Sequence, residues 1–412
     1  MIMYSGYQWL LIEIAGHFGL DKLTFDKRIQ WSEKHLDSLE TMAIGADDKP
    51  LYEKAVMALR KAQQGIATGH LVGVDASASG IQIMSALTGC IAGATATNLV
   101  DPTVRNDAYS ILTNTMNDIL GGNFHVSRPD AKDAMMKSFY GSKAEPIAIF
   151  GEETPELNAY YKAAYQIAPG PWELLQDLLA SWQPYALLHE WKLPDGYDAR
   201  VKVMTQIETR VEVDELDHAT FTYVYYVNEG EEKGLSNAAN VIHSVDAYIL
   251  RSMHRRCNYD AAMVAKAAEI IELELLERHC GGTRIEGIPM GKAGYYVEQY
   301  KRSNLADITI LPFINDLNVR QLSYFHLMGI ASIVKGMLQY KPFELVTIHD
   351  EFKCHPNNVN WVRWQYKEIL ADLADSNTLN DLLSQLYGNN VQFNMFSDNL
   401  GDVIRNSEYA LC

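Results

Sequence analysis

Two short apolar stretches of this sequence each end on an aspartate. LVGVD ends at Asp75, and ELVTIHD ends at Asp350. An aspartate at the end of a strand is most often a turn former, which is the simplest interpretation of either residue alone. On neighbouring strands, however, two such carboxylates can hold two divalent ions close together. Mg²⁺ suits a pair of this kind, because it prefers a few carboxylates together with phosphate oxygens and water.

A second group of residues recurs at a spacing of four within SRPDAKDAMMKSFYGS, residues 127–142. Residues four apart share one face of a helix. The residues on that face are Arg128, Lys132, Met136 and Tyr140. Ser127 and Asp130 have the spacing of a capping box at the start of a helix, and Gly141 suits the left-handed position after a helix end.

The two cations on this face repel each other slightly, and a polyphosphate bound along the face would offset that repulsion. Alone, the pattern is more typical of a solvated helix surface. Opposite a pair of metal-binding carboxylates, it indicates in-line phosphoryl or nucleotidyl transfer assisted by two metals.

The elements that must position these residues form an α+β pattern. Amphipathic periodicity predicts helices within residues 1–70, 101–190, 236–280 and 319–340. Apolar and alternating residues predict strands at 71–75 and near 199–227. FELVTIHDEF predicts a strand that carries His349 and Asp350 into a hairpin. The sequence therefore predicts a small sheet among many helices.

Composition and charge limit the class of protein. The chain has 412 residues, 48% hydrophobic and 21% charged, as in ordinary globular domains. No apolar run approaches the ~18 residues of a membrane span. The N-terminal stretch contains Glu13 and lacks the basic start of a signal peptide. The five cysteines form no CxxC pair, so we expect reduced thiols.

The net charge of −17 counts against a nucleic-acid binder, because such proteins are usually basic on the contact face. It does not exclude one. The acids bunch in stretches such as VEVDELD, NEGEEK and EIIELELLE, which can face away from a bound nucleic acid.

Three motifs together resemble one family. DASASGIQ, RPDAKDAMMKSFYGS and IHDEF resemble, in that order, the three polymerase motifs of the single-subunit phage and mitochondrial RNA polymerases. Flanking stretches such as GLDKLTFDKRIQWSEKH, VIHSVDA and the tail NLGDVIRNSEYALC extend the resemblance over most of the chain. The resemblance implies a right-hand polymerase fold, mostly helical, with a small antiparallel palm sheet and with fingers that contain the 128–140 helix. It implies DNA-dependent RNA synthesis from ribonucleoside triphosphates, with release of pyrophosphate.

The resemblance also assigns roles to residues. Asp75 and Asp350, with the backbone carbonyl of Ala76, would hold two Mg²⁺ ions. Arg128 and Lys132 would hold the incoming triphosphate, and Lys132 would neutralise charge as pyrophosphate leaves.

Other positions would contact the nucleotide or the product. Tyr140 would lie beside the new base pair and sense the ribose 2′-hydroxyl, next to Met136 and Gly141 in the substrate-binding motif. His243 would contact the nucleotide on its sugar side, although a buried helix histidine is the simpler interpretation without the resemblance. The last two assignments place Tyr109 near the phosphates and His349 by the RNA 3′ end.

A related right-hand DNA polymerase is the nearest alternative. The family resemblance favours the RNA enzymes on two details: Met136 stands where the DNA enzymes have Phe, and the small residues after Asp75 include no Glu to exclude a 2′-hydroxyl. Two other classes stay open, namely a non-catalytic accessory subunit and a metal-dependent phosphohydrolase.

The resemblance divides the chain into five expected segments. These are a helical N-terminal part at 1–70, palm with the first aspartate at 71–100, fingers at 101–253, an insertion at 254–318, and palm with the second aspartate and the tail at 319–412.

One family element has no counterpart here. The family places a D-x-x-G-R element and a large N-terminal domain well before the first aspartate, and this sequence contains no D-x-x-G-R. The split polymerases of the coliphage N-four group imply that this chain is the larger, catalytic subunit and that a smaller second subunit carries the missing elements. The other expected partners are template DNA, RNA product, ribonucleoside triphosphates and a single-stranded-DNA-binding factor. We expect no membrane association, and we expect the cytoplasm of an infected bacterial host.

Overall fold

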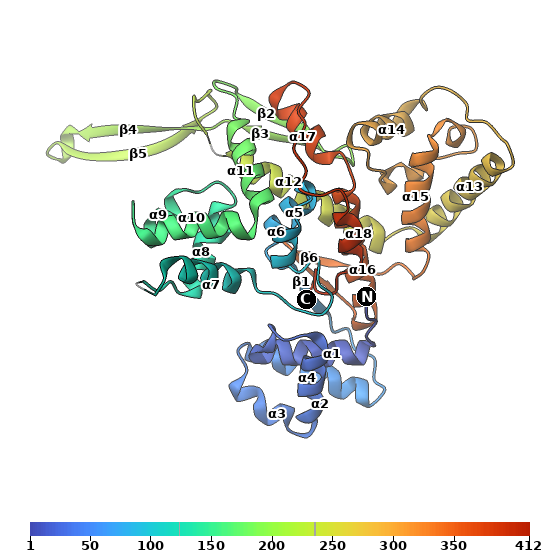
Figure 1. Cartoon of the computed structure of the whole chain (residues 1–412), viewed down its shortest axis with the longest axis horizontal. Coiled ribbons are helices and arrows are strands. Elements are labelled where there is room, and N and C mark those ends of the chain that lie inside the picture. Colours follow the sequence, from blue (N-terminus) through green and yellow to red (C-terminus); the bar gives the residue numbers. More distant parts are fainter. Residues whose placement is uncertain (123, 235) are drawn as a thin grey trace.

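The computed structural model describes residues 1–122, 124–234 and 236–412. Over these residues the chain is mostly helical and contains three small antiparallel sheets, which confirms the α+β expectation. The N-terminal helices lie at one end, and two further groups of helices extend to either side of a central sheet (Figure 1). Among the described residues, no helix has the length and apolarity needed to cross a membrane.

The central sheet has the strand order β1-β7-β6. Strands β1 (Val72–Asp75) and β6 (Val346–Ile348) both pair antiparallel with β7 (Glu351–Cys354). His349 and Asp350 form the turn between β6 and β7, so the predicted hairpin is confirmed. His349 has a φ of 55°, in the left-handed region that a tight turn requires.

This sheet brings the two aspartate motifs together. Asp75 stands opposite Glu351 in the β1–β7 register, one residue from Asp350. The N–H of Ala76 donates to the carbonyl oxygen of Asp350 at 3.3 Å. Segments far apart in the sequence are therefore joined by backbone pairing, as the interpretation of the aspartates required.

The segment at the other end of the chain adds to β1. Leu411 forms an antiparallel bridge with Ala76, and Cys412 exchanges backbone hydrogen bonds of 3.0 and 3.3 Å with Asp75. Tyr409 and Leu411 are buried, and the Tyr409 ring lies 4.9 Å from that of Phe25. The tail thus packs directly beneath the first aspartate.

The predicted N-terminal helices are present and pack beside β1. These helices are α1 (Gly6–Ala15), α2 (Phe25–Lys34), α3 (Leu39–Met42) and α4 (Lys49–Gln63). Helix α1 packs on both α2 and α4 and also contacts β1. Tyr4, Trp9 and Phe25 meet edge to face in the buried seam between these helices.

Four helices form the interior behind the central sheet. They are α5 (Ser79–Thr88), α11 (Pro169–Ala180), α12 (Ser236–Cys257) and α16 (Val359–Ala374). Helix α5 contacts the other three, and nearly all of its residues are buried, which fixes the position of the loop between Asp75 and its first turn.

The helix that carries the four-residue pattern is α8 (Arg128–Ser138), which packs on α7 (Ala108–Leu120) and α9 (Ala144–Phe150). Its Ser127 cap accepts from the N–H of Asp130, as predicted. In a complete capping box the Asp130 carboxylate would also accept from the backbone N–H of Ser127. Here it accepts from the Ser127 hydroxyl instead, at 2.6 Å. Helix α10 (Pro155–Ile167) packs against α7 and completes this group.

Two hairpins follow these helices. Strand β2 (Leu188–Lys192) pairs with β3 (Asp198–Lys202), and β4 (Thr205–Val213) pairs with β5 (Ala219–Val227). The prediction of strands near 199–227 is confirmed. The prediction of helix through residue 190 was wrong at its end, where LHEWK alternates buried and exposed residues as a strand does.

The expected insertion has its own hydrophobic core. Its helices are α13 (Ala261–His279), α14 (Gly291–Ser303) and α15 (Tyr324–Met337). Buried residues from Tyr259 to Met337 form a cluster separate from the main core. The buried cluster therefore continues past residue 318, because α15 packs with α13 and contributes to the same core. Three α-helices remain among the described residues. Helix α6 (Ile91–Ala96) packs against α5, α17 (Thr378–Tyr387) packs against β2, and α18 (Leu400–Arg405) packs against α16.

Candidate active site

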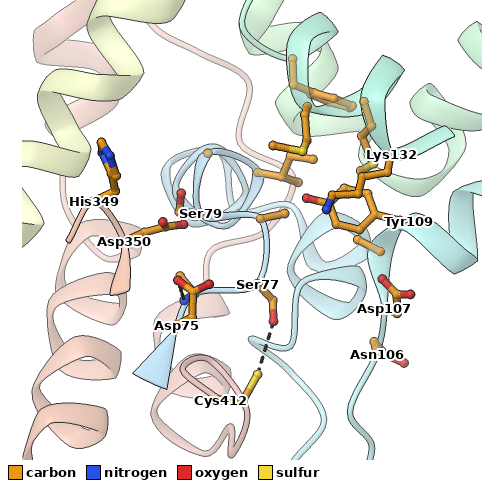
Figure 2. Close-up of a pocket in the computed structure, with 18 of the residues that line it drawn as sticks. Asp75, Ser77, Ser79, Asn106, Asp107, Tyr109, Lys132, His349, Asp350 and Cys412 are labelled. Carbon is orange, nitrogen blue, oxygen red and sulfur yellow. Dashed lines mark hydrogen bonds between the residues drawn. The ribbon is translucent and has the colours of Figure 1, made fainter. Parts of the chain in front are cut away.

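A cavity of about 650 Å³ opens beside the central sheet (Figure 2). Helices α7, α8 and α12 and the first turn of α5 line its other sides. Most of the residues that the sequence predicted for the site line this cavity. They are Asp75, Ala76, Tyr109, Lys132, Met136, Tyr140, His243, His349 and Asp350.

One wall of the cavity is acidic. Asp75 and Asp350 project into it from the end of β1 and from the β6–β7 turn, and Figure 2 shows them on the same side. Loss of hydration, followed by repulsion from Asp350 and Glu351, raises the pKa of Asp75 to about 6. The N–H of Ala76 donates to the Asp75 carboxylate at 3.0 Å and opposes that rise.

A third carboxylate joins this wall. Asp246 of α12 lines the cavity, and burial, followed by repulsion from Asp350, raises its pKa to about 6, while His349 acts in the opposite direction. We did not predict Asp246 as a site residue. The signal was present, because Asp246 follows His243 by three residues and therefore shares its face of the helix.

The opposite wall carries cations. Lys132 of α8 lines the cavity and lies 5.7 Å from the centre of the Tyr109 ring. Lys22 and Arg105 also line the cavity, but on the side of Asp75: Lys22 acts to lower the pKa of Asp75, and Arg105 contacts Cys412. Neither was predicted. Both lie outside the α8 pattern, in connecting segments, so only the folded chain shows that they line the same cavity as Lys132.

Arg128 is placed differently from the expectation. Its guanidinium makes a two-pronged ion pair with Asp107, with Nε and Nη2 at 2.6 and 3.0 Å from the two carboxylate oxygens. The pair lowers the pKa of Asp107 against the effect of burial. Asp107 lines the cavity, and Arg128 stands behind it. In this arrangement two N–H groups of the Arg128 guanidinium donate to the Asp107 carboxylate. A phosphate that binds Arg128 would have to share the guanidinium with Asp107 or displace Asp107.

The inner end of the cavity is aromatic. The rings of Tyr140 and His243 lie 4.8 Å apart with an angle of 31° between their planes. Burial, followed by repulsion from Asp246 and Asp350, raises the pKa of Tyr140 to about 12, so the phenol is protonated at neutral pH and can donate a hydrogen bond. Gly80 makes room for this ring, since a Cβ there would lie 2.3 Å from the Tyr140 hydroxyl. Gly141 follows with a φ of 103°, as its predicted role after the helix requires.

The tail closes the cavity near the first aspartate. The Cys412 thiol lies 3.6 Å from the Ser77 hydroxyl and accepts from Nε of Arg105 at 3.2 Å. Arg105 is thereby held at the cavity edge by the residue that also pairs with the Asp75 backbone.

The donor set on the acidic wall fits Mg²⁺. Carboxylate oxygens are hard ligands, and burial together with repulsion from Asp350 and Glu351 raises the pKa of Asp75, so a bound cation would stabilise its charged form. A different group of potential ligands, Glu212, Asp214 and His218, lies at the exposed tip of the β4–β5 hairpin. In that group His218 pairs with both acids, which accounts for the cluster without an ion.

Comparisons with known proteins found similarity over the first third of the chain. Residues 2–141 match the family model described as DNA-dependent RNA polymerase. A DNA-directed RNA polymerase of Pseudomonas phage phiKMV is 30% identical over 132 residues, which is 28% of this chain and 16% of that protein. The chain thus spans only a small part of the length of this relative. The matched range of the family model includes Asp75 and the whole of α8.

Proposed function

We propose that this chain is the catalytic subunit of a DNA-dependent RNA polymerase of the phage and mitochondrial type, with palm and fingers arranged as in a right-hand polymerase. The observation that carries the proposal is one cavity in which Asp75 and Asp350 face Lys132 and the Tyr140–His243 pair. These are the groups that nucleotidyl transfer needs: ligands for metal, a cation for phosphate, and a surface for the nucleotide.

Each wall has a separate task in this proposal. Asp75 and Asp350, with the carbonyl of Ala76, would hold two Mg²⁺ ions, which supply activation of the attacking hydroxyl and charge stabilisation of the leaving pyrophosphate. Lys132 binds the triphosphate and offsets its developing charge, and Lys22 and Arg105 line the same cavity. Arg128 joins them when the phosphate displaces or shares Asp107, and Tyr109 orients both cations through its ring.

The proposed choice of ribonucleotides depends on Tyr140. Its protonated phenol donates a hydrogen bond to the ribose 2′-hydroxyl, while the neighbouring His243 contacts the sugar side of the nucleotide. His349, in the turn next to Asp350, would lie by the RNA 3′ end. A DNA polymerase is the second candidate, and Met136 in the cavity lining favours the RNA enzyme by resemblance only.

The proposal includes a second subunit that carries the D-x-x-G-R element and makes this chain the larger half of a split enzyme. Exposed apolar side chains in the N-terminal part support it: Ile44, in the turn before α4, is 89% exposed, Met57 on α4 63%, and Ile66 in the loop after α4 51%. The net charge of −17 also suits a division in which the partner carries much of the nucleic-acid contact. The proposal also includes a single-stranded-DNA-binding factor as a partner and the cytoplasm of an infected bacterial host as the location.

Extension of an RNA primer on a DNA template tests the function. The chain, alone and with the protein encoded beside it, is incubated with primed template, four ribonucleotides and Mg²⁺. Template-directed extension with release of pyrophosphate is expected. Extension with deoxynucleotides alone would favour the DNA polymerase, and phosphate release without primer would indicate a phosphohydrolase. Absence of any turnover with the partner present would indicate an accessory subunit.

A further inference from the structure

The outer edge of β1 is only partly covered. On its inner side, β1 pairs with β7 over the whole of Val72–Asp75. On its outer side, the tail reaches the chain at Asp75 and Ala76. No other described strand pairs with this edge, because β1 is an end strand of its sheet. An uncovered strand edge is a ready template for pairing with another chain.

Alternation along β1 shows which backbone groups face the open edge. Backbone N–H and C=O groups of residues two apart point to the same side of a strand. Those of Asp75 point outward, since they bond to Cys412. Those of Gly73 therefore point outward as well, and on that side neither group has a hydrogen-bond partner among the described residues. Gly73 is half-buried, so these two groups lie in a recess.

A second cavity, of about 220 Å³, lies along this edge. Leu71–Val74 form one side of it, and residues of α1, α2 and α4 form others, with Leu51 and Lys54 exposed at the rim. His70 also lines the cavity and is buried. Its Nε2 lies 2.6 Å from a carboxylate oxygen of Glu13, whereas its Nδ1 has no partner in the described part of the chain. Buried polar groups without partners are destabilising, so a ligand that satisfies them is favoured.

Two cations of this cavity have no carboxylate partner within the described residues. Lys54 makes no ion pair there, and the buried guanidinium of Arg28 donates to backbone carbonyl oxygens. An incoming carboxylate would therefore be attracted to the side of the cavity that holds Lys54. The acids of the lining already have basic partners, namely Glu13 with His17 and His70, Asp21 with Lys22, and Glu351 with Lys353.

These features distinguish between possible occupants. Gly73 offers one donor and one acceptor from the same residue, which matches the backbone of an extended peptide. Nucleic acid is disfavoured, because its phosphates accept hydrogen bonds and would leave the Gly73 carbonyl unpaired. Edge-to-edge pairing with a second copy of the chain is disfavoured too, because the β1 edge of that copy lies in the same recess between helices.

We propose that an extended segment of the second subunit adds to the outer edge of β1 at Gly73 and places an acidic side chain near Lys54. The existence of that subunit is taken from the proposed function, on which this inference rests. The added segment continues the ladder that the tail begins at Asp75, so β1 is held from both sides just before its catalytic aspartate. Main-chain hydrogen bonds supply the affinity, and the cavity selects the side chain.

Hydrogen exchange at residue resolution gives the first test. The full chain is measured alone and in complex with the purified protein encoded beside it. The Gly73 amide should exchange quickly in the free chain and at least about tenfold more slowly in the complex. Unchanged exchange at Gly73 in the complex, or absence of a complex, would overturn the proposal.

RNA extension by the same samples separates this inference from the proposed function. A complex that protects Gly73 but cannot extend RNA would refute the polymerase and leave the pairing intact. Conversely, extension by a complex in which Gly73 stays unprotected would refute the pairing alone.

Two pairs of variants give the second test, with affinity for the same protein as the readout. Gly73→Pro removes an N–H that β7 does not use, whereas the control Gly73→Ala keeps it. Both add a carbon beside Glu351, whose Oε1 would lie 2.3 Å from a Cβ at this position and can move. The proline variant should bind at least about tenfold more weakly than the alanine variant, with thermal unfolding of both recorded.

The second pair leaves the strand unchanged. Lys54→Glu should weaken binding at least about fivefold, because it repels the acidic side chain. Its control is Lys49→Glu on the same helix, which lies outside the cavity lining and pairs with Glu53 in the wild type, and it should bind within about twofold of wild type. Equal affinities within either pair would overturn the proposal.

Discussion

The two walls of the cavity are built in different ways. Asp75 and Asp350 of the acidic wall are positioned by main-chain pairing, because β7 and the Cys412 segment both hydrogen bond to the strand or loop that carries Asp75, and the Ala76 N–H donates to the Asp350 carbonyl. Asp246 of the same wall extends from helix α12. The cationic and aromatic wall consists of side chains that extend from helices, and one of its expected members, Arg128, is held by Asp107. Asp75 and Asp350 are therefore pre-positioned, whereas Arg128 can change partners when a ligand enters.

Removing charge from the acidic wall is expected to have the largest effect. Asp75→Asn or Asp350→Asn should lower RNA extension by on the order of 10³-fold, because each removes a ligand charge but leaves the backbone pairing intact. Thermal unfolding should stay close to that of wild type.

The matched control is Glu351→Gln. Glu351 stands opposite Asp75 in the sheet but pairs with Lys353 at 3.1 Å and lies outside the cavity lining. It should extend RNA at close to the wild-type rate. An active Asp350→Asn enzyme, or an equally inactive Glu351→Gln enzyme, would show that the wall has been assigned wrongly.

Deleting the C-terminal residues that pair with β1 is expected to displace Asp75 of the same wall. A chain ending at Glu408 loses the Leu411 bridge to Ala76 and the two hydrogen bonds to the Asp75 backbone. We expect about tenfold slower extension from misplacement of Asp75, with the far-ultraviolet circular dichroism retained. Cys412→Ser keeps the backbone pairing and should stay within about threefold of wild type. Full activity of the shortened chain would mean that the tail does not position Asp75.

A change on the opposite wall should alter selectivity more than rate. Tyr140→Phe keeps the ring against His243 and removes the hydroxyl that would pair with ribose. Discrimination between ATP and dATP should fall by about tenfold, while ribonucleotide extension stays within about threefold. The ratio is measured by competition between the two nucleotides in one reaction. Unchanged discrimination would remove Tyr140 from ribose recognition.

The smallest expected effect concerns the third carboxylate. The pKa of Asp246 is raised from an ordinary 3.8 to about 6 in the folded chain, so this group favours folding when protonated, and that stability is lost as pH rises through about 6. In metal-free protein, Asp246→Asn should raise the free energy of unfolding at pH 7, relative to the change at pH 4, by on the order of 1 kcal/mol. Denaturant titrations at both pH values measure it, and parallel pH dependence in the two proteins would contradict it.

Local sequence signals were sufficient for the parts of the site that depend on local structure. The strand-end aspartates, the turn at His349 and Asp350, and helix α8 with its Gly141 exit all follow from strand, turn and helix patterns, and the structure has them. The strand order also agrees with the expectation that the two aspartates are neighbours.

Contacts between distant segments were not predictable in the same way. Lys22 and Arg105 belong to no periodic pattern, and their convergence on the cavity depends on how the N-terminal helices and the tail pack. The ion pair between Arg128 and Asp107 is likewise tertiary. The separate core around α13 and α15 crosses the expected boundary at 318, because apolar periodicity shows that a helix is amphipathic but not which core receives its face.

The central claim is that the two walls form one nucleotide site. The most direct measurement is a double-mutant cycle with Asp350→Asn and Lys132→Ala, using the affinity for Mg·ATP in the presence of a primed template whose 3′ end cannot be extended. If one triphosphate bridges both walls, the effect of Lys132→Ala should shrink in the Asp350→Asn background, with a coupling of at least about 1 kcal/mol. Lys137→Ala, on the same helix but paired with Glu145, should show no coupling. Additive effects of Asp350→Asn and Lys132→Ala would contradict a shared site.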